Sequence, residues 1–264
     1  MFSKIYKNLH FVINLQMSKK QVVPYKNNRS SKKKQVRQMF DSISARYDII
    51  NRIISGGLDL KWRKNVVKVV KHKRPKRILD VATGTGDLAI ALGKNLASEI
   101  IGIDISKQML EIGKKKVEKN QLQKNIKMEI GDGEKINYPN NYFDAVTVSF
   151  GVRNFENLDK GLLEIYRVLK PGSKLVILET SIPQSFPLNC LYHLYTLYFL
   201  PLIGLFFSKD KSAYKYLSSS AKSFPFGKAF NKILKKNGFV VIDNIPQSFG
   251  VASIYHSQKP LPGV

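Results

Sequence analysis

Cysteine and histidine are scarce in this sequence. One cysteine, Cys190, and four scattered histidines occur among its 264 residues. A single thiol excludes a disulfide framework, and histidines without cysteine or histidine neighbours form no recognisable zinc-binding pattern, so we expect no metal site. A chain without disulfides is typical of a reducing compartment, which favours a cytoplasmic protein.

Acidic residues are also few. The chain has 19 Asp and Glu against 44 Lys and Arg, which gives a formal charge of +25. Such an excess favours an anionic partner, either nucleic acid or a lipid surface. Lysine outnumbers arginine 35 to 9, whereas recognition of bases and phosphates favours the planar guanidinium group. We therefore expect a solvated lysine-rich surface, with attraction to an anionic membrane as the alternative and no specific nucleic acid as a partner.

Only one long hydrophobic run is present, residues 186–207, and it contains no charged residue. Its length approaches the roughly 20 residues of a transmembrane helix, but Pro187, Pro201 and Gly204 interrupt it. It also lies between two strands of one predicted sheet. We expect an apolar cap insertion, residues 183–227, that covers a pocket and could rest against a membrane. A pair of ordinary core helices and a spanning helix are the alternatives.

The N-terminal end is basic and has no acid before Asp41. Residues 1–16 lack the small-residue cleavage site of a secretory signal, and Met17 offers an alternative start. We predict that residues 1–16 are not needed, that residues 1–34 form a flexible basic arm, and that residues 35–264 form a single domain.

Short apolar runs alternate with helical patterns along that domain. Strands are predicted at 78–82, 100–103, 126–130, 145–150 and 175–178, and helices at 35–46, 62–70, 88–96, 109–117 and 158–169. The apolar face of the first helix continues through residues 49–54 until residues 55–57 break it. Such alternation indicates an α/β fold with a mostly parallel sheet covered by helices on both faces. The segments 239–245 and 251–256 predict a terminal antiparallel hairpin.

A glycine-rich turn follows the first predicted strand. Gly84 and Gly86 let the backbone approach a ligand closely there, before the next helix begins. Asp104 lies twenty residues after Gly84 and ends the second strand, where its carboxylate can accept hydrogen bonds from ribose hydroxyl groups. Nicotinamide and adenosyl cofactors both require these features.

Acidic residues around this turn favour an adenosyl cofactor over a nicotinamide cofactor. Asp80 stands four positions before Gly84, and Asp87 begins the following helix. Asp87 would repel a pyrophosphate and attract the cationic methionine end of S-adenosylmethionine. Asp132 and Gly133 end the third strand and suit the edge of an adenine, with an ordinary turn as the alternative.

Taken in order, these motifs resemble those of class I S-adenosylmethionine methyltransferases. Three further blocks are similar to the ubiquinone/menaquinone biosynthesis C-methyltransferases: Tyr47 to Asn51 with Ser55 and Trp62, Ser149 to Asn154, and Arg167 to Ser181. The resemblance covers about residues 22–258. Ser173 and Asp59 depart from the usual pattern, and Asp59 is closer to the bacterial menaquinone type.

The resemblance implies a Rossmann-like, seven-stranded fold and S-adenosylmethionine as the cofactor. It implies C-methylation of a prenylated demethylmenaquinol to menaquinol, with the benzoquinol step of ubiquinone biosynthesis as the alternative. A nucleic-acid methyltransferase and a nicotinamide-dependent oxidoreductase are more distant alternatives. An apolar cap and a basic arm would suit a substrate that resides in the bilayer. The oligomeric state is not predicted.

The resemblance also assigns residues to the site. Its cofactor-binding positions are Thr85, Asp104, Asp132, Gly133 and Ser149, together with the turn residues Asp80, Gly84 and Gly86. Its catalytic positions are Arg153, Asn154 and Tyr47. Arg153 would stabilise a phenolate or orient a water, with a surface ion pair as the alternative. Asn154 would hydrogen-bond the quinol oxygen, and Tyr47 would close over the pocket, with packing as its alternative.

Overall fold

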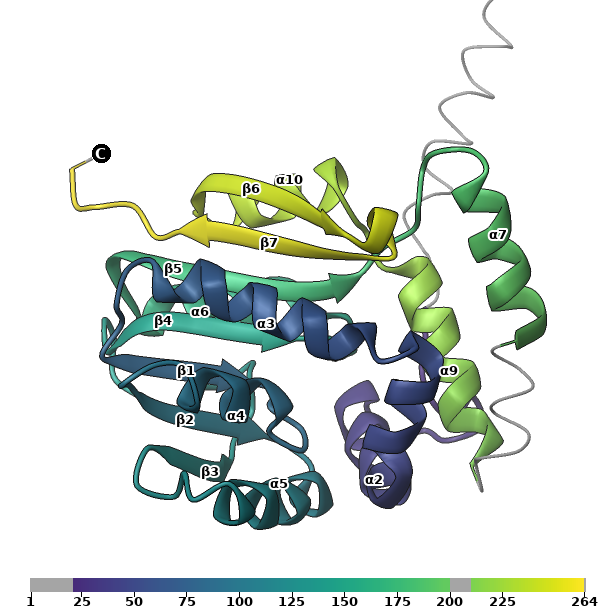
Figure 1. Ribbon diagram of the computed structural model, residues 1–264, viewed down its shortest axis with the longest axis horizontal. Helices are drawn as coiled ribbons and strands as arrows, with labels where there is room; N and C mark the ends of the chain where they lie inside the picture. The colour runs from purple at the N-terminus through teal and green to yellow at the C-terminus, as the bar shows by residue number, and fades with distance from the viewer. Residues whose placement is uncertain (1–20, 200–209, 264) are drawn as a thin grey trace, which may run out of the picture.

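The computed structural model describes residues 21–199 and 210–263. The predictions about residues 1–16 and Met17 lie outside these described residues. Figure 1 shows a central sheet with helices on its two faces and a group of helices beyond the carboxyl ends of its parallel strands.

The sheet has seven strands in the order β3-β2-β1-β4-β5-β7-β6. Their bounds are β1 Arg77–Val81, β2 Glu99–Asp104, β3 Ile126–Ile130, β4 Phe143–Ser149, β5 Leu169–Thr180, β6 Val240–Gln247 and β7 Ala252–Gln258. The first five are parallel, and β7 pairs antiparallel with both β5 and β6. The predicted parallel sheet and terminal hairpin are therefore confirmed. The strand order reverses between β1 and β4, which is where open α/β sheets bind ligands.

Each face of the sheet is covered by its own helices. One face packs against α3 (Leu58–Lys71), α4 (Asp87–Gly93) and α5 (Lys107–Lys119), and the other against α6 (Leu158–Val168) and α10 (Lys228–Lys236). Alternate residues of each strand point to opposite faces, so Ile78 contributes to the first core and Leu79 to the second. Helices on both faces were predicted, and the structure confirms them.

Two more helices pack over the carboxyl ends of the strands: α2 (Lys32–Ser55) and α9 (Lys211–Ser223). They form a third apolar cluster that includes Met39, Met109 and Tyr216. The helix α2 extends beyond the predicted helix at 35–46, along the apolar face expected to continue through residues 49–54, because neither proline nor glycine interrupts it before Gly56. Gly56 adopts a left-handed conformation and ends the helix.

Ordered contacts begin before the predicted domain start at residue 35. The helix α2 begins at Lys32, and the Ser31 hydroxyl caps it by accepting from the Lys34 amide. The Tyr25 hydroxyl donates to Asp210 at 2.6 Å, and the Tyr25 amide donates to Gln35 at 2.9 Å. Residues 21–34 of the predicted flexible arm are therefore held against the domain.

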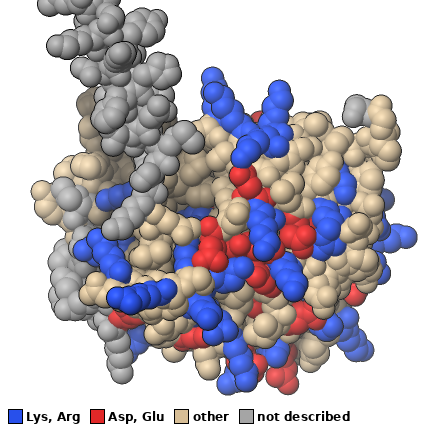
Figure 2. Space-filling view, turned by 180° about the vertical axis from the view of Figure 1, so that it is seen from behind, with Lys and Arg blue, Asp and Glu red and all other residues tan. Residues whose placement is uncertain are grey.

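Charged side chains are mixed over the surface. On the face shown in Figure 2, Lys and Arg side chains spread widely, with Asp and Glu side chains between them. This distribution resembles the predicted solvated surface more than a single basic groove.

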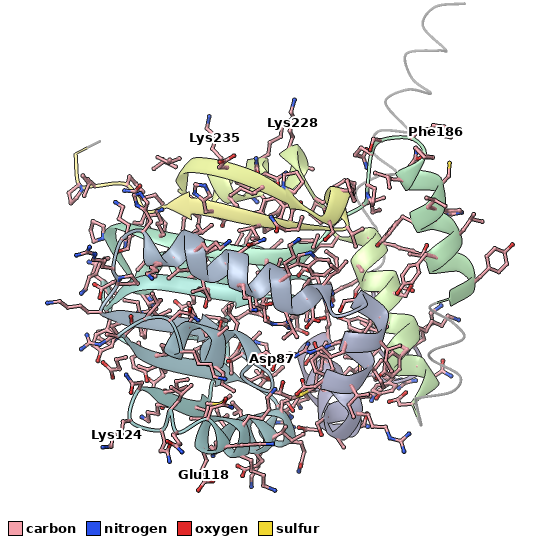
Figure 3. The ribbon with its side chains drawn as sticks, viewed as in Figure 1. Asp87, Glu118, Lys124, Phe186, Lys228 and Lys235 are labelled. Carbon is pink, nitrogen blue, oxygen red and sulfur yellow. The ribbon has the colours of Figure 1, made fainter. Side chains whose placement is uncertain are left out.

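The predicted cap insertion contains the helix α7 (Leu188–Leu194), the π-helical turn η3 (Tyr195–Phe199) and the helix α9. The helix α7 stands at the periphery, and Phe186 before it is 81% exposed (Figure 3). Leu191, Leu194 and Tyr198 are exposed as well. Among the described residues, no helix is long and apolar enough to span a membrane.

Candidate functional site

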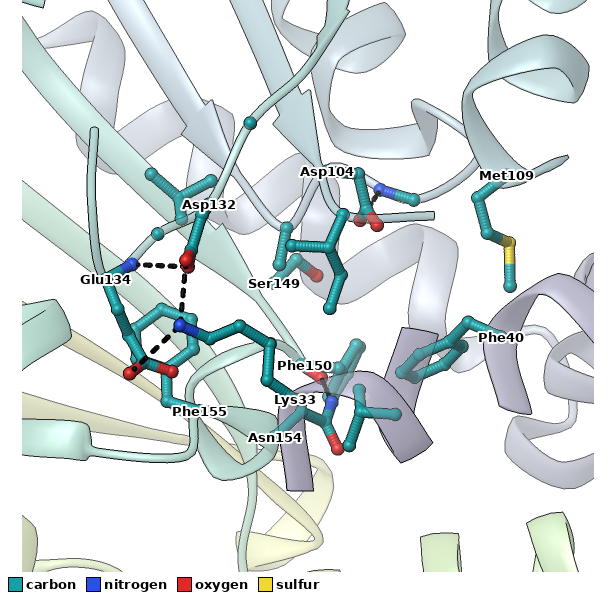
Figure 4. A pocket seen from close by; sticks show the side chains of 18 of the residues that line it. Lys33, Phe40, Asp104, Met109, Asp132, Glu134, Ser149, Phe150, Asn154 and Phe155 are labelled. Carbon is teal, nitrogen blue, oxygen red and sulfur yellow. Dashed lines mark hydrogen bonds and ion pairs between the residues drawn. The ribbon is translucent and has the colours of Figure 1, made fainter. Parts of the chain in front are cut away.

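A cavity lies at the carboxyl ends of the central strands, beneath α2 (Figure 4). Its lining comes from α2, the ends of the first four strands and the segments that follow them: Lys33, Val36, Phe40, Tyr47, Val81, Ala82, Gly84, Asp104, Ile105, Met109, Gly131, Asp132, Gly133, Glu134, Ser149, Phe150, Gly151, Asn154 and Phe155.

The turn after β1 forms one wall of this cavity. Gly84 has a positive φ of 58°, and a side chain placed there would meet no atom within 4 Å. Its amide donates to the Asp104 carboxylate at 2.9 Å. The turn is thereby fixed to the end of β2, and bare backbone faces the space where a ligand would lie.

Asp104 is a buried acidic residue of the cavity wall. Besides Gly84, its carboxylate accepts from the Ser106 amide at 2.8 Å, yet each oxygen keeps a further lone pair. Burial is the main cause that raises its pKa to about 6, and Asp41 adds to the rise, while the backbone amides oppose it. At neutral pH the group is ionised and can accept hydrogen bonds from a diol.

The loop after β3 approaches the cavity through two glycines. A methyl group on Gly131 would come within 2.8 Å of Ile103, and one on Gly133 within 2.8 Å of Val81. Between them, the Asp132 carboxylate accepts from the Glu134 amide at 2.9 Å and pairs with Lys33 at 2.7 Å. Lys33 also lies 3.4 Å from Glu134 (Figure 4).

Lys33 is a site residue that sequence reasoning missed. It belonged to the segment predicted as a flexible arm, and nothing local marks a lysine in a basic run as a pocket residue. Its basic neighbour Lys32 is also buried and donates to the carbonyl groups of Arg153 and Phe155. Burial lowers the pKa of Lys32 to about 8. The two lysines fix the start of α2 over the cavity.

Ser149 supplies a polar atom without a partner. Its hydroxyl oxygen is buried at the end of β4 and makes no hydrogen bond. Buried polar atoms are normally satisfied, so an unpartnered hydroxyl group in a cavity wall suits a ligand that bonds to it.

These observations fit S-adenosylmethionine. Asp104 would hold the ribose, Asp132 and Gly133 the adenine edge, and the backbone at Gly84 the methionine end. The Ser149 hydroxyl would form a hydrogen bond with the same molecule.

Three predicted cofactor residues lie outside the lining and support it instead. Asp80 is buried and accepts from the hydroxyl groups of Thr83 and Thr147, both at 2.6 Å. Thr85 donates to Asp48 of α2 at 2.6 Å. Gly86 precedes α4, and a side chain there would press against Met128. They hold the turn in place from behind.

Asp87 does not have the electrostatic role predicted for it. Its carboxylate pairs with Arg52 at 2.5 Å and with Lys116 (Figure 3). Burial opposes its ionisation, but Arg63 and Lys116 outweigh that effect and hold its pKa below the usual value. Because these cations already neutralise Asp87, it offers little attraction to a cationic ligand.

The predicted catalytic residues divide between two places. Tyr47 and Asn154 line the cavity, whereas Arg153 lies outside the lining. Arg153 forms an ion pair with Glu179 at 2.5 Å, and their side chains are only 8% and 0% exposed. An ion pair was the predicted alternative for Arg153, but the pair is buried rather than on the surface.

The cavity wall at Asn154 leads to the helix α9. The Asn154 carboxamide accepts from the Tyr216 hydroxyl at 3.2 Å and donates to the carbonyl of Phe150 at 3.3 Å. Tyr216 is the contact of the predicted cap with this wall, and α7 contributes no lining residue.

Comparisons with known proteins agree with this geometry. The sequence model of the ubiE/COQ5 methyltransferase family matches residues 28–259. A demethylmenaquinone methyltransferase of Bacteroides fragilis is 42% identical over 239 residues, which cover 90% of this chain and 97% of that protein. The ubiquinone/menaquinone biosynthesis C-methyltransferase UbiE of Geotalea daltonii is 42% identical over 232 residues, with coverages of 87% and 98%.

A solved structure supports the fold. A SAM-dependent methyltransferase of Thermotoga maritima superposes with a TM-score of 0.60 at 16% identity, covering 84% of this chain and 99% of that one. At this identity the likeness concerns the fold alone.

Proposed function

Because the chain belongs to the ubiE/COQ5 methyltransferase family, we propose that it methylates a ring carbon of a prenylated demethylmenaquinol to give menaquinol. The benzoquinol step of ubiquinone biosynthesis is the second candidate, since the Geotalea daltonii relative carries both quinones in its name. The observation that carries the proposal is one cavity in which Asp104 and Ser149 lie together with Tyr47 and Asn154.

The reaction needs few functional groups from the protein. S-adenosylmethionine supplies an electrophilic methyl group when it is bound. The chain has to hold the acceptor ring against that group, keep water away and handle one proton. Apolar residues make up much of the cavity wall, which suits an aromatic ring, and Phe40, Phe150 and Phe155 supply aromatic contacts.

Tyr47 and Asn154 are the polar groups for the acceptor. Burial raises the pKa of Tyr47, with Arg153 opposing it, so its hydroxyl stays neutral and serves as a donor rather than as a base. Asn154 presents an amide that is held by Phe150 and Tyr216. We assign both to orientation of a quinol oxygen, with the proton acceptor to be found elsewhere.

Labelled S-adenosylmethionine tests the proposal directly. Purified protein is incubated with a methyl-labelled donor and a panel of short-tailed demethylmenaquinols and benzoquinols, and the label in each ring is measured. Incorporation into the naphthoquinol ring is expected. Asp104→Asn should remove it, whereas Asp243→Asn on the outer strand β6 should not. Absence of label in every quinol would refute the proposal.

We also propose peripheral contact with an anionic membrane, where a prenylated substrate resides. Phe186, Leu191, Leu194 and Tyr198 expose an apolar surface around α7, and the chain carries a large positive charge. Apolar insertion combined with basic attraction is the usual basis of such binding. Co-sedimentation of the protein with phosphatidylglycerol vesicles is expected to weaken at high salt and in the variant Leu191→Ser. The variant Leu163→Ser is the control, because Leu163 is an exposed leucine on α6. Equal binding by all three proteins would contradict the proposal.

A further inference from the structure

The buried pair of Arg153 and Glu179 is incompletely satisfied. One arginine nitrogen, Nη1, contacts one carboxylate oxygen, Oε1, at 2.5 Å. Arg153 Nε and Glu179 Oε2 are also buried, but neither has a hydrogen-bond partner. Leaving charged groups partly unpaired inside a protein is unfavourable, so these two atoms require an explanation.

The remaining contacts of the pair involve the same two atoms, Nη1 and Oε1. Glu179 Oε1 additionally accepts from the amide of Thr180 at 2.7 Å and from its hydroxyl at 3.2 Å. Arg153 Nη1 additionally donates to the carbonyl of Phe150 at 3.0 Å. The pair is thus anchored through Nη1 and Oε1, while the buried donor Nε and the buried acceptor Oε2 stay unused. A hydroxyl group, which accepts and donates at the same time, is the complement of such a pair.

The position of the pair adjoins the proposed site. The Arg153 guanidinium lies 5.9 Å from the ring centre of Phe150, and Phe150 lines the cavity. Burial raises the pKa values of three tyrosines near the pair, and the charge of Arg153 opposes this rise in each: Tyr47, Tyr192 and Tyr216. These tyrosines come from α2, α7 and α9, so the pair lies between the cofactor cavity and the cap.

Resting on the proposed function, we propose that Glu179 Oε2 accepts the hydroxyl proton of the quinol while Arg153 Nε donates to the same quinol oxygen. The oxygen electron pair moves into the ring as the ring carbon takes the methyl group, and the pair of the broken carbon–sulfur bond remains on sulfur. The quinol oxygen thereby becomes a protonated carbonyl, a strong acid, so transfer of its proton to a carboxylate is downhill.

The remaining steps restore the ring and the carboxylate. The methylated carbon loses its hydrogen as a proton to solvent, and the electrons of that bond return to the ring. Glu179 gives its proton back to the quinol oxygen. The balance is one methyl group gained by the ring and one proton released. Arg153 stabilises the charge on oxygen throughout, as a donor whose position is fixed by its contact with Glu179.

Glu179→Gln tests this assignment because it keeps the shape but cannot take up a proton. We expect turnover at pH 7 to fall by about 100-fold or more, the usual effect of losing a general base. Turnover of the variant should recover as the pH rises, because the quinol then ionises without help, near the ordinary phenol pKa of about 10. A loss that is the same at every pH would show a structural role and overturn the proposal.

Binding of a redox-inert probe supplies a second readout. 4-Methoxy-1-naphthol has one hydroxyl group, and 1,4-dimethoxynaphthalene has none. The wild-type protein should prefer the naphthol, measured by fluorescence titration, and Glu179→Gln should lose most of that preference. A preference that persists unchanged in the variant would overturn the proposal. This measurement needs no methyl transfer, so it separates failure of the assignment from failure of the proposed function.

Two further variants guard against unfolding. Glu179→Gln leaves Arg153 without a counter-ion, so Glu179→Asp is made in parallel. Aspartate keeps the charge, but its side chain is shorter. This variant should lose turnover and still bind S-adenosylmethionine, as measured by calorimetry. Glu164→Gln is the matched control, because Glu164 pairs with Arg167 on α6 away from the cavity. Full turnover in Glu179→Asp together with Glu179→Gln would remove Glu179 from the reaction.

Discussion

Lys33 on α2 contacts Asp132 in the loop after β3, with 2.7 Å between Nζ and the carboxylate oxygen. The two side chains are each about a third exposed, and both residues line the cavity (Figure 4). Asp132 is also the carboxylate assigned to the adenine edge. The helix α2 and the adenine group of a bound cofactor would therefore compete for the same acceptor.

Lys33→Met is expected to strengthen cofactor binding slightly. The substitution keeps the apolar stem over the cavity but frees Asp132 for the adenine group. A partly exposed ion pair contributes about 0 to 1 kcal/mol, so the dissociation constant should fall by no more than about fivefold. Calorimetric titration with S-adenosylmethionine measures it, with the exposed Lys34→Met as control. Weaker binding would mean that Lys33 holds the cofactor in place instead.

Cofactor affinity should depend on pH through Asp104. Its pKa of about 6 in the free protein means that the carboxylate is protonated at lower pH and can no longer accept both ribose hydroxyls. The dissociation constant should rise by up to about tenfold for each pH unit below 6 and be flat above 7. Asp104→Asn should bind weakly at every pH. An affinity of the wild-type protein that is constant from pH 5 to 7 would contradict this.

The strands, the mostly parallel sheet and the glycine turn could be predicted from the sequence because the signals are local. Apolar runs such as 78–82 report burial on both faces, and the parallel order brings Gly84, Asp104 and Ser149 to one edge of the sheet. Any residue that ends a central parallel strand is therefore a candidate for the site before its contacts are known.

The contacts made by α2 could not be predicted in the same way. Lys33 reaches the loop after β3, and Asp48 takes the Thr85 hydroxyl, only because this helix packs over the carboxyl edge. The same packing brings Arg52 to Asp87 and cancels the charge that the sequence seemed to offer a ligand. Glu179 was overlooked because a glutamate at the end of a buried strand gives no sign of its partner.

Asp80 should make stability depend on pH in the opposite direction to most carboxylates. Burial raises its folded-state pKa from 3.8 to about 6, while the hydroxyls of Thr147 and Thr83 oppose the rise. Between these values the folded protein binds more protons than the unfolded chain, so this contribution to stability is present at low pH and is lost as the pH rises from about 4 to 6. The shift corresponds to on the order of 2 to 3 kcal/mol.

The difference between wild type and Asp80→Asn isolates this contribution. Other carboxylates with lowered pKa values, such as Asp144, act in the opposite sense and are common to both proteins. The free energy of unfolding is measured by urea titration at pH 4, 5, 6 and 7. Wild type should lose stability relative to the variant as the pH increases. A difference that is independent of pH would show that Asp80 does not titrate in this range.

Gly133 and Gly84 should tolerate substitution differently, because they are glycine for different physical reasons. A methyl group on Gly133 would lie 2.8 Å from Val81 and 2.9 Å from Phe155, so Gly133→Ala should destabilise the protein by about 1 to 3 kcal/mol through overpacking and weaken cofactor binding. Gly84 has free space around it but a positive φ of 58°, so Gly84→Ala should cost about 1 to 2 kcal/mol through backbone strain.

Asparagine distinguishes the two causes, because it tolerates the left-handed conformation but is larger than alanine. Gly84→Asn should therefore be more stable than Gly84→Ala, whereas Gly133→Asn should be less stable than Gly133→Ala. Urea unfolding of the four variants gives both comparisons in one experiment. If the alanine variant is the more stable one at both positions, the backbone conformation at Gly84 is not what requires glycine. The close approach of a ligand to that turn then becomes the remaining physical reason why this position has no side chain.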